Sequence, residues 1–158
     1  MVIGVNGPNF GKVFCLPDDY EVIDNSLNDI KYNVDPKYTP DHLNIFDKEV
    51  FLARSLEGTE FTPGMVGLNN LKLTSFANVI IQLLSTVKPV RDHYLLEQTV
   101  TEPAKDLKQL LSNKFGELIR KIWNPLNFKG HVSPAEFIEA VSLASSGKFK
   151  CDMKPNEY

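Results

Sequence analysis

The stretch with the most capacity for chemistry is GLNNLKLTSFANVIIQ, residues 67–82, in which a polar loop leads into an apolar-striped segment. This pattern is typical of a loop that presents a nucleophile at the start of a helix, and Ser75 stands at the presenting position. A serine hydroxyl is a weak nucleophile and needs a base that a third group orients. The alternative, which we favour, is that Thr74 and Ser75 only suit a helix cap.

Metal chemistry has little support in the sequence. Zinc sites are usually built from closely spaced Cys or His pairs. Here Cys15 and Cys151 lie near opposite ends of the chain, and His42, His93 and His131 occur singly. The sequence therefore predicts no metal site and no cofactor.

Length and composition indicate one globular domain. The chain has 158 residues, of which 42% are hydrophobic, and its net charge of −3 gives no reason to expect a nucleic-acid-binding face. No apolar run approaches the roughly 20 residues of a membrane span. The glycine-rich start is too short for a secretory signal, so we expect a soluble intracellular protein.

The elements that must position the 67–82 stretch are mainly helical. We predict helices near 40–55, 75–87, 104–122 and 134–146, and a short β element around 12–23, where two apolar runs flank a Pro-Asp-Asp turn. Thr39-Pro40-Asp41 is a helix start signal, and Ser133-Pro134-Ala135-Glu136 has the form of a capping box.

Apolar residues at helical spacing mark the faces expected to form the core. In order along the chain, they are Leu43, Phe46, Val50 and Ala53; Phe76, Val79, Ile80, Leu83, Leu84 and Val87; Leu107, Leu110, Leu111, Phe115, Leu118, Ile119 and Ile122; and Phe137, Ile138 and Val141.

Residues 67–82 resemble the cysteine box of the ubiquitin-specific peptidases, whose form is Gly-Leu-x-Asn-Leu-Gly-x-Thr-Cys-x-x-Asn-x-x-x-Gln. The matching positions are Gly67, Leu68, Asn70, Leu71, Thr74, Asn78 and Gln82. The flanking stretches CLPDDYEVIDNSLNDI, TPGMVGLNN and FGELIRKIWNPLNFKGHVSPAEF are similar to one branch of the family. That branch comprises catalytically inactive splicing factors of the tri-snRNP.

The resemblance implies a mainly α fold with a small β element. This would be a partial papain-like ubiquitin-peptidase fold, with a helical thumb-like subdomain preceded by a remnant of a ubiquitin-hydrolase-type zinc finger. We expect the edge of that finger in residues 1–38, a linker helix in 39–58, and the start of the peptidase-like domain in 59–158. Compared with the family, the chain is expected to be truncated at both ends.

The departures from the family pattern imply that the protein has no catalytic residues. Ser75 stands where active relatives have the nucleophilic cysteine, and Asn70 matches a position that supplies an oxyanion donor. The family's histidine box would lie beyond Tyr158. Lys72 and Leu73 replace small or polar residues that let the loop approach the substrate. Asn70, Ser75, Asn78 and Gln82 are thus the positions of a degenerate cysteine box.

The resemblance further implies a non-catalytic, nuclear protein that acts in pre-mRNA splicing through protein contacts in the tri-snRNP. Weak binding of ubiquitin or a ubiquitin-like protein stays possible in this reading, whereas direct nucleic-acid or membrane contact is not expected. The alternatives are a deubiquitinating enzyme that uses Ser75, and a fragment without independent function.

A loop after the third predicted helix could contact the partner, since recognition residues often lie on loops. The candidates are Trp123, Phe128, Lys129 and His131. The alternative, to which we give more weight, is that Trp123 and Phe128 seal the base of the helical core.

Overall fold

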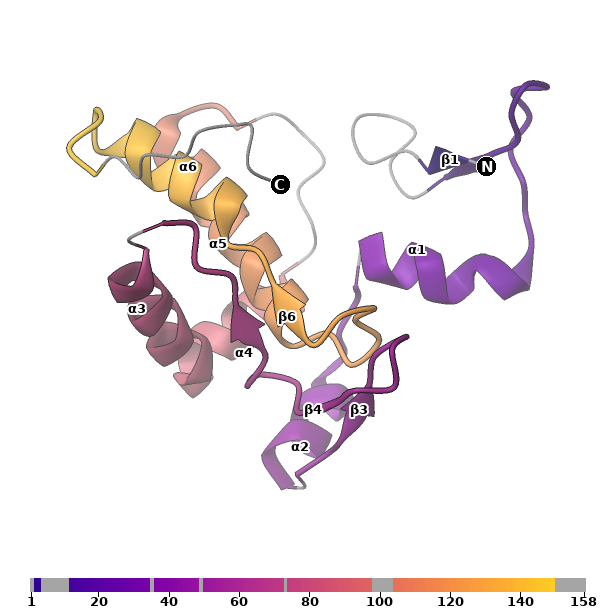
Figure 1. The fold of residues 1–158 in the computed structure, drawn as a ribbon, viewed down its shortest axis with the longest axis horizontal. Coiled ribbons are helices and arrows are strands. Elements are labelled where there is room, and N and C mark those ends of the chain that lie inside the picture. Colours follow the sequence, from indigo (N-terminus) through magenta and orange to yellow (C-terminus); the bar gives the residue numbers. More distant parts are fainter. Residues whose placement is uncertain are drawn as a thin grey trace.

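A computed structural model of the chain describes residues 2–3, 12–34, 36–48, 50–72, 74–97 and 104–149. The α-helices of the described part are α1 (Asn28–Val34), α2 (Pro40–Lys48), α3 (Ser75–Thr86), α4 (Lys88–Leu96), α5 (Leu107–Ile122) and α6 (Ala135–Ala144), as Figure 1 shows. A 3-10 turn, Asn25–Leu27, precedes α1. None of the described helices combines the length and the apolar character that a bilayer span requires.

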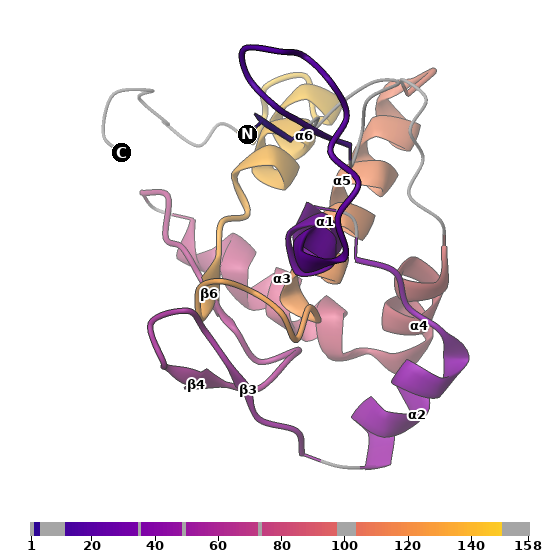
Figure 2. The same cartoon turned by 90° about the vertical axis from the view of Figure 1, so that its right-hand side faces the viewer.

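The strands are short and form three two-stranded sheets. β1 (Val2–Ile3) pairs antiparallel with β2 (Val13–Phe14), and β3 (Ala53–Arg54) pairs antiparallel with β4 (Glu60–Phe61). β5 (Gly67–Leu68) pairs parallel with β6 (His131–Val132). Both views place the β3–β4 hairpin at the end of the molecule opposite to α6 (Figures 1 and 2).

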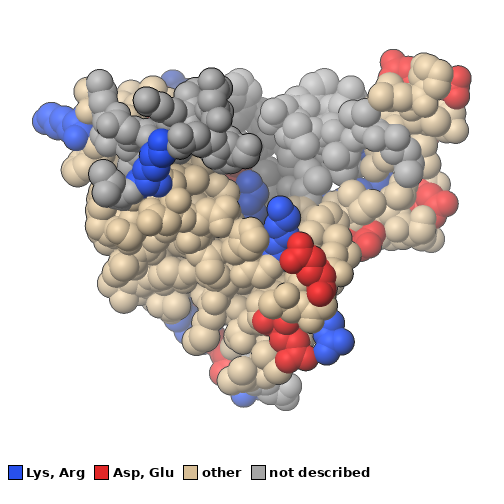
Figure 3. Space-filling model, in the orientation of Figure 1, with Lys and Arg blue, Asp and Glu red and all other residues tan. Residues whose placement is uncertain are grey.

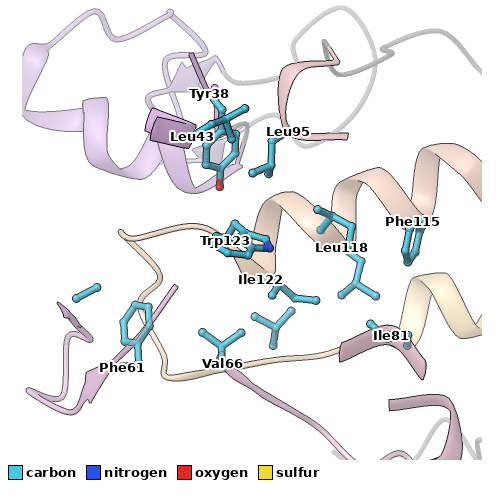
Figure 4. Packing of buried hydrophobic residues seen from close by; sticks show 13 residues of the cluster. Tyr38, Leu43, Phe61, Val66, Ile81, Leu95, Phe115, Leu118, Ile122 and Trp123 are labelled. Carbon is cyan, nitrogen blue, oxygen red and sulfur yellow. The ribbon is translucent and has the colours of Figure 1, made fainter. Parts of the chain in front are cut away.

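Helix α5 is the centre of the packing. Its N-terminus is capped by Asp106, whose carboxylate accepts a hydrogen bond from the Gln109 amide at 2.7 Å. Helices α4 and α6 both pack against it. Its buried residues meet side chains from α2, α3, α4 and the strands (Figure 4), and the buried hydrophobic cluster comprises Tyr38, Leu43, Ala53, Phe61, Val66, Ile81, Leu95, Phe115, Leu118, Ile119, Ile122, Trp123 and Val132.

Polar contacts attach α1 and the segment before α2 to the end of α5 and the residues that follow it. The Tyr38 hydroxyl is buried and donates to the Arg120 carbonyl at 2.6 Å. The Asn124 amide, which is fully buried, donates to Asn33 Oδ1 at 3.1 Å, and Asn33 Nδ2 donates to the Leu126 carbonyl at 2.6 Å. Residues from α1 through the segment before α2 are therefore anchored to the helical core.

Arg91 of α4 links α2, α4 and the C-terminal end of α5. Arg91 is 4% exposed, and its guanidinium lies 4.8 Å from the centroid of the Trp123 ring. Its Nη2 atom is 2.8 Å from Asp47 Oδ1 and 2.6 Å from Asp92 Oδ1. Asp47 also pairs with Lys88, and the hydrogen bonds from Lys88 and then Arg91 lower the pKa of its carboxyl group.

The predicted β element around 12–23 is confirmed, and so are the helices at 104–122 and 134–146, with slightly shorter bounds. Phe14 in β2 forms a bridge to Glu21 across the turn. Phe115, Leu118, Ile119 and Ile122 are buried as the periodicity predicted.

The predicted helix 40–55 is wrong beyond Lys48. Leu43 is buried and Phe46 packs on Trp123, but Val50 is 87% exposed and Ala53 lies in β3. The helical spacing of apolar residues extends by chance past the end of α2, into a segment that forms the β3–β4 hairpin. In that hairpin Ala53 lies opposite Phe61. The three-way division at 38 and 58 stays a prediction.

Two helices of the structure lie outside the predicted set. The segment after Val87 continues as α4, because Pro89 occupies the first turn, where a missing N–H costs nothing. Helix α1 was not predicted either.

The capping box at the start of α6 does not form, since Pro134 is the N-cap residue and no side chain caps it. Glu136 reaches α5 instead, where it is 2.9 Å from Lys114 Nζ and 3.8 Å from Lys121 Nζ.

The stripe predicted to bury the 75–87 helix faces solvent. Phe76, Val79, Ile80 and Leu83 are each more than half exposed, and only Ile81 and Ser85 of α3 are buried. The periodicity correctly predicted a helix but not the side that packs on the protein.

Candidate functional site

The cysteine-box segment folds as a strand, a loop and a helix. β5 pairs with β6, with Gly67 opposite His131, and the backbone N–H of Asn69 donates to the Val132 carbonyl at 3.0 Å. The chain then turns into α3, which begins at Ser75 with Thr74 at the N-cap position. The expected presentation of Ser75 at a helix start is thus present.

Asn70 and Thr74 close the loop by bonding to each other. Asn70 Oδ1 accepts from the Thr74 amide at 3.2 Å and from the Thr74 hydroxyl at 3.1 Å. Thr74 Oγ1 in turn accepts from the Leu71 amide at 2.9 Å, and Thr74 is fully buried. The Thr74 side chain therefore stabilises the loop and makes no capping bond to α3.

Asn78 and Gln82 attach the inner face of α3 to the strand before it. Asn78 Nδ2 donates to the carbonyls of Asn69 at 3.1 Å and Leu68 at 3.4 Å, and Gln82 Nε2 donates to the Val66 carbonyl at 2.6 Å. These bonds supply donors to backbone carbonyls of β5 and of the two residues that flank it. The buried Asn78 Oδ1 has no hydrogen-bond partner within the described part of the chain.

Ser75 is exposed, and within the described residues its hydroxyl has no bonded base. Across the described ranges, no hydrogen bond joins its hydroxyl to a histidine or a carboxylate. His93 lies on α4, 3.7 Å from Glu97 and stacked on Tyr94, and His131 lies on β6 beside Gly67. The arrangement thus contains the loop of a nucleophile site without a bonded nucleophile–base pair.

Lys72 adopts a backbone conformation that favours glycine. Its φ angle is 51°, in the left-handed region, and the cysteine-box pattern has glycine at this position. A side chain there costs roughly 1–2 kcal/mol. Leu73, the other predicted departure in the loop, lies outside the described residues.

Trp123 is a core residue. It is 8% exposed, its Nε1 donates to the Ser85 carbonyl at 3.0 Å, and its ring packs against Phe46 at 5.3 Å between centroids. Gly64 lies directly against the ring, since a Cβ there would be 2.6 Å from it. Trp123, one of the predicted partner-binding residues, is therefore not accessible to a partner protein.

The rest of that loop reaches the surface. Phe128 is 38% exposed while its carbonyl accepts from the Leu56 amide at 3.1 Å, and Lys129 and His131 are exposed.

No group of three or more potential ligands within the described ranges is placed to hold a metal, and Cys151 lies outside them.

Comparison with known proteins places these observations in a family. The family model "Ubiquitin carboxyl-terminal hydrolase" matches residues 66–154, more than half of the chain. The chain is 46% identical over 142 residues to "Ubiquitin carboxyl-terminal hydrolase 39" of Homo sapiens, which covers 88% of this chain and 25% of the relative. It is 36% identical over 138 residues to "Probable mRNA-splicing protein ubp10" of Schizosaccharomyces pombe. This match covers 87% of this chain and 26% of the relative.

Two further comparisons point to splicing factors. "Pre-mRNA-splicing factor SAD1" of Saccharomyces cerevisiae is 28% identical over 136 residues, covering 84% of this chain and 28% of the relative. A solved structure titled "Crystal structure of an essential yeast splicing factor" matches 91% of this chain and 35% of its own, with a TM-score of 0.72 and 24% identity, which supports the shared fold.

The chain thus spans about a quarter of the length of the curated relatives it matches. The cysteine-box positions, the strand–loop–helix that carries them and the matched family model agree: the chain belongs to the ubiquitin carboxyl-terminal hydrolase family, in the branch whose relatives are splicing factors.

Proposed function

We propose that the protein is a non-catalytic family member that acts in pre-mRNA splicing, in the nucleus, through protein contacts in the tri-snRNP. The observation that carries this proposal is the similarity to two relatives named as splicing proteins, which extends over 84–87% of this chain. That range includes the N-terminal helices as well as the cysteine box, so the likeness is not limited to the family's common motif.

The geometry of the cysteine box supports the absence of catalysis. Ser75 replaces the cysteine and has no bonded base among the described residues. Asn70, at the oxyanion-donor position, uses its side-chain oxygen to hold Thr74. A donor without a nucleophile and a base retains only a small part of a catalytic site's rate acceleration, roughly 10³–10⁴-fold over water in an otherwise intact site.

The proposed contact region is the loop that contains Phe128, Lys129 and His131. Trp123 is left out of it because its side chain is buried in the core. We also propose that residues 1–38 contain a remnant of the zinc-finger edge, that residues 39–58 are a linker, and that the peptidase-like part begins near residue 59. In support, the family model begins at residue 66, while similarity to the relatives named as splicing proteins covers most of the chain.

Affinity purification of the tagged chain from nuclear extract tests the splicing role. We expect tri-snRNP proteins to co-purify with the wild type and to be depleted with the Lys129→Ala/His131→Ala variant. Both side chains are exposed, so the melting temperature should change little. As a matched control, Lys12→Ala/Lys31→Ala removes two cations elsewhere. If wild type brings down no spliceosomal protein, the proposed function is wrong; equal recovery with both variants removes only the loop assignment.

A deubiquitinating enzyme is the second candidate, and membership of the hydrolase family favours it. An electrophilic ubiquitin probe separates the two functions, because covalent labelling requires a competent nucleophile. We expect no labelling of the wild type or of Ser75→Ala. Labelling of the wild type that Ser75→Ala abolishes would establish the enzyme instead.

A further inference from the structure

A closed ring of hydrogen bonds joins α1 to the segment that follows α5. Asn33 Nδ2 donates to the Leu126 carbonyl at 2.6 Å, the Leu126 backbone N–H donates to Asn124 Oδ1 at 2.8 Å, and Asn124 Nδ2 donates to Asn33 Oδ1 at 3.1 Å. Each of the two side-chain amides is thus both a donor and an acceptor. Turning either amide over would place N–H against N–H and oxygen against oxygen, so the ring fits only one arrangement of these groups.

The inner side of the ring belongs to Asn124, which has no solvent exposure. A buried amide without a hydrogen-bond partner is costly, so the loss of Asn33 would leave the Asn124 amide, and the turn that it forms with Leu126, without support. Asn33 Nδ2 also donates to the Asp29 carbonyl of its own helix at 3.2 Å. The Asn33 side chain is therefore held by α1 and directed at the residues after α5.

The ring links α1 to the rest of the protein outside the hydrophobic core. None of the described residues of α1 belongs to the buried hydrophobic cluster, and Val13 and Leu27, which are buried in the N-terminal segment, are also outside it. Besides the ring, Tyr32 of α1 contacts Tyr38 edge to face, with 6.4 Å between the ring centroids. Breaking the ring should therefore loosen α1 without opening the core around α5.

The ring also fixes the start of the proposed contact loop, because Leu126 lies two positions before Phe128. Further along the loop, Asn127 Nδ2 donates to the Lys121 carbonyl at 2.7 Å. The Phe128 carbonyl accepts from the Leu56 backbone N–H at 3.1 Å. The loop is thus held at its start from α1 and in its middle from the β3–β4 hairpin.

The direction of the Phe128 and Lys129 side chains depends on this backbone support. His131 is fixed by the pairing of β6 with β5, and residues 127–130 span the stretch between that pairing and the ring. The Lys129 side chain is exposed and has no ion pair or hydrogen bond within the described residues. Figure 3 shows charged side chains gathered over the β3–β4 hairpin and the adjoining loop, whereas the surface over α3 carries few. The path of the loop backbone therefore decides what this part of the surface presents to a partner.

We propose that Asn33 and Asn124 are positioning residues for the contact loop, so that the docking of α1 builds part of the partner-binding surface. This inference rests on the proposed function, in which the loop with Phe128, Lys129 and His131 contacts a tri-snRNP protein. Helix α1 lies in the segment 1–38, and the ring couples that segment to a binding surface 93 positions further along the chain. The partner needs no contact with α1 for this coupling.

Asn33→Asp tests the positioning role with almost no change in side-chain size. The new carboxylate keeps an oxygen for the Asn124 amide but turns an acceptor toward the Leu126 carbonyl, so the ring cannot close. We expect amide hydrogen exchange in residues 124–131 to become roughly tenfold faster than in the wild type, with α5 and α6 unchanged. Asn28→Asp is the matched control, because it adds the same charge at an exposed residue of α1, and it should exchange like the wild type.

Lowering the pH provides a chemical rescue of Asn33→Asp. When it is protonated, the new carboxyl group donates its O–H to the Leu126 carbonyl, and the ring closes again. The neighbouring carbonyl oxygens disfavour the charged form and raise its pKa above the usual value of about 3.9. Protection of residues 124–131, compared with the wild type at the same pH, should therefore recover between about pH 6 and 4. A steric disturbance of the loop would not respond to pH in this way.

Affinity purification from nuclear extract gives the functional readout. Recovery of tri-snRNP proteins should fall with Asn33→Asp as it does with Lys129→Ala/His131→Ala, and it should stay at the wild-type level with Asn28→Asp. Equal loop exchange in Asn33→Asp and Asn28→Asp overturns the positioning role, whether or not the wild type binds a spliceosomal protein. Faster exchange throughout α5 and α6, or full recovery of the partner despite a loosened loop, overturns it equally. The wild type alone is also informative, since a Leu126 N–H that exchanges as fast as an unbonded amide would exclude the ring.

Discussion

Among the glycines of the described residues, Gly64 is the one at which a single added methyl group should lower the free energy of unfolding most. A Cβ built there would lie 2.6, 2.7 and 2.8 Å from Cζ2, Cη2 and Cε2 of Trp123. The ring cannot easily move away, because its Nε1 is bonded to the Ser85 carbonyl and Arg91 covers its face. The φ angle of Gly64, 84°, is also unfavourable for any other residue.

The magnitude follows from these two effects. A left-handed alanine costs about 1–2 kcal/mol, and forcing a methyl into a packed contact costs about 1–3 kcal/mol. Gly64→Ala should therefore reduce the free energy of unfolding by about 3 kcal/mol, a large part of the 5–15 kcal/mol of a typical domain. At about 2–4 °C per kcal/mol, the melting temperature should fall by about 6–12 °C.

Urea denaturation followed by fluorescence is a direct assay, since Trp123 is the only tryptophan in the chain. Gly58→Ala is the matched control, because Gly58 has a φ of 81° but nothing within 4 Å of a built Cβ. It should lose only the backbone contribution, about 1–2 kcal/mol. Equal destabilisation of both variants would refute the close packing of Trp123 on Gly64.

Three further predictions concern the loop, the helix contact and the cysteine box. Lys72→Gly should raise the free energy of unfolding by about 1 kcal/mol in the same urea assay, because it relieves the left-handed strain at φ 51°; a decrease would contradict that strain. The hydrogen bond from Lys114 lowers the pKa of Glu136, so this carboxylate stabilises the fold above its unfolded pKa and loses the effect as pH falls through the folded value. Glu136→Gln should flatten the decline of stability between about pH 5 and 3, only modestly since the side chain is 60% exposed, and an unchanged slope would argue against the pair. Ser75→Cys should not hydrolyse linked di-ubiquitin, because a helix start lowers a thiol pKa of about 8.5 by less than about one unit and no base among the described residues is bonded at this position; measurable turnover would reveal a base, with His93 and His131 as the first residues to mutate.

The cysteine box shows how much of the site could be recognised without a structure. Fixed residue types at fixed spacing identified the family and placed Ser75 at the start of a helix, as α3 confirms. The bonds that make Asn70, Asn78 and Gln82 structural could not be predicted. They depend on where β5 lies relative to α3, and β5 pairs with β6, more than sixty residues away.

Local sequence by itself determined that the chain is helix-rich and where α5 and α6 lie, because a 3.6-residue apolar period is a property of the segment alone. Only the tertiary structure decided that the hairpin replaces the end of the 40–55 helix, that Trp123 is enclosed, and that the stripe of α3 faces outward. Periodicity specifies that one face of a helix is apolar, but the neighbours that cover a face come from distant parts of the chain or from another molecule. In α3, hydrogen bonds from the polar face to the strand determine the orientation, so the apolar face points outward.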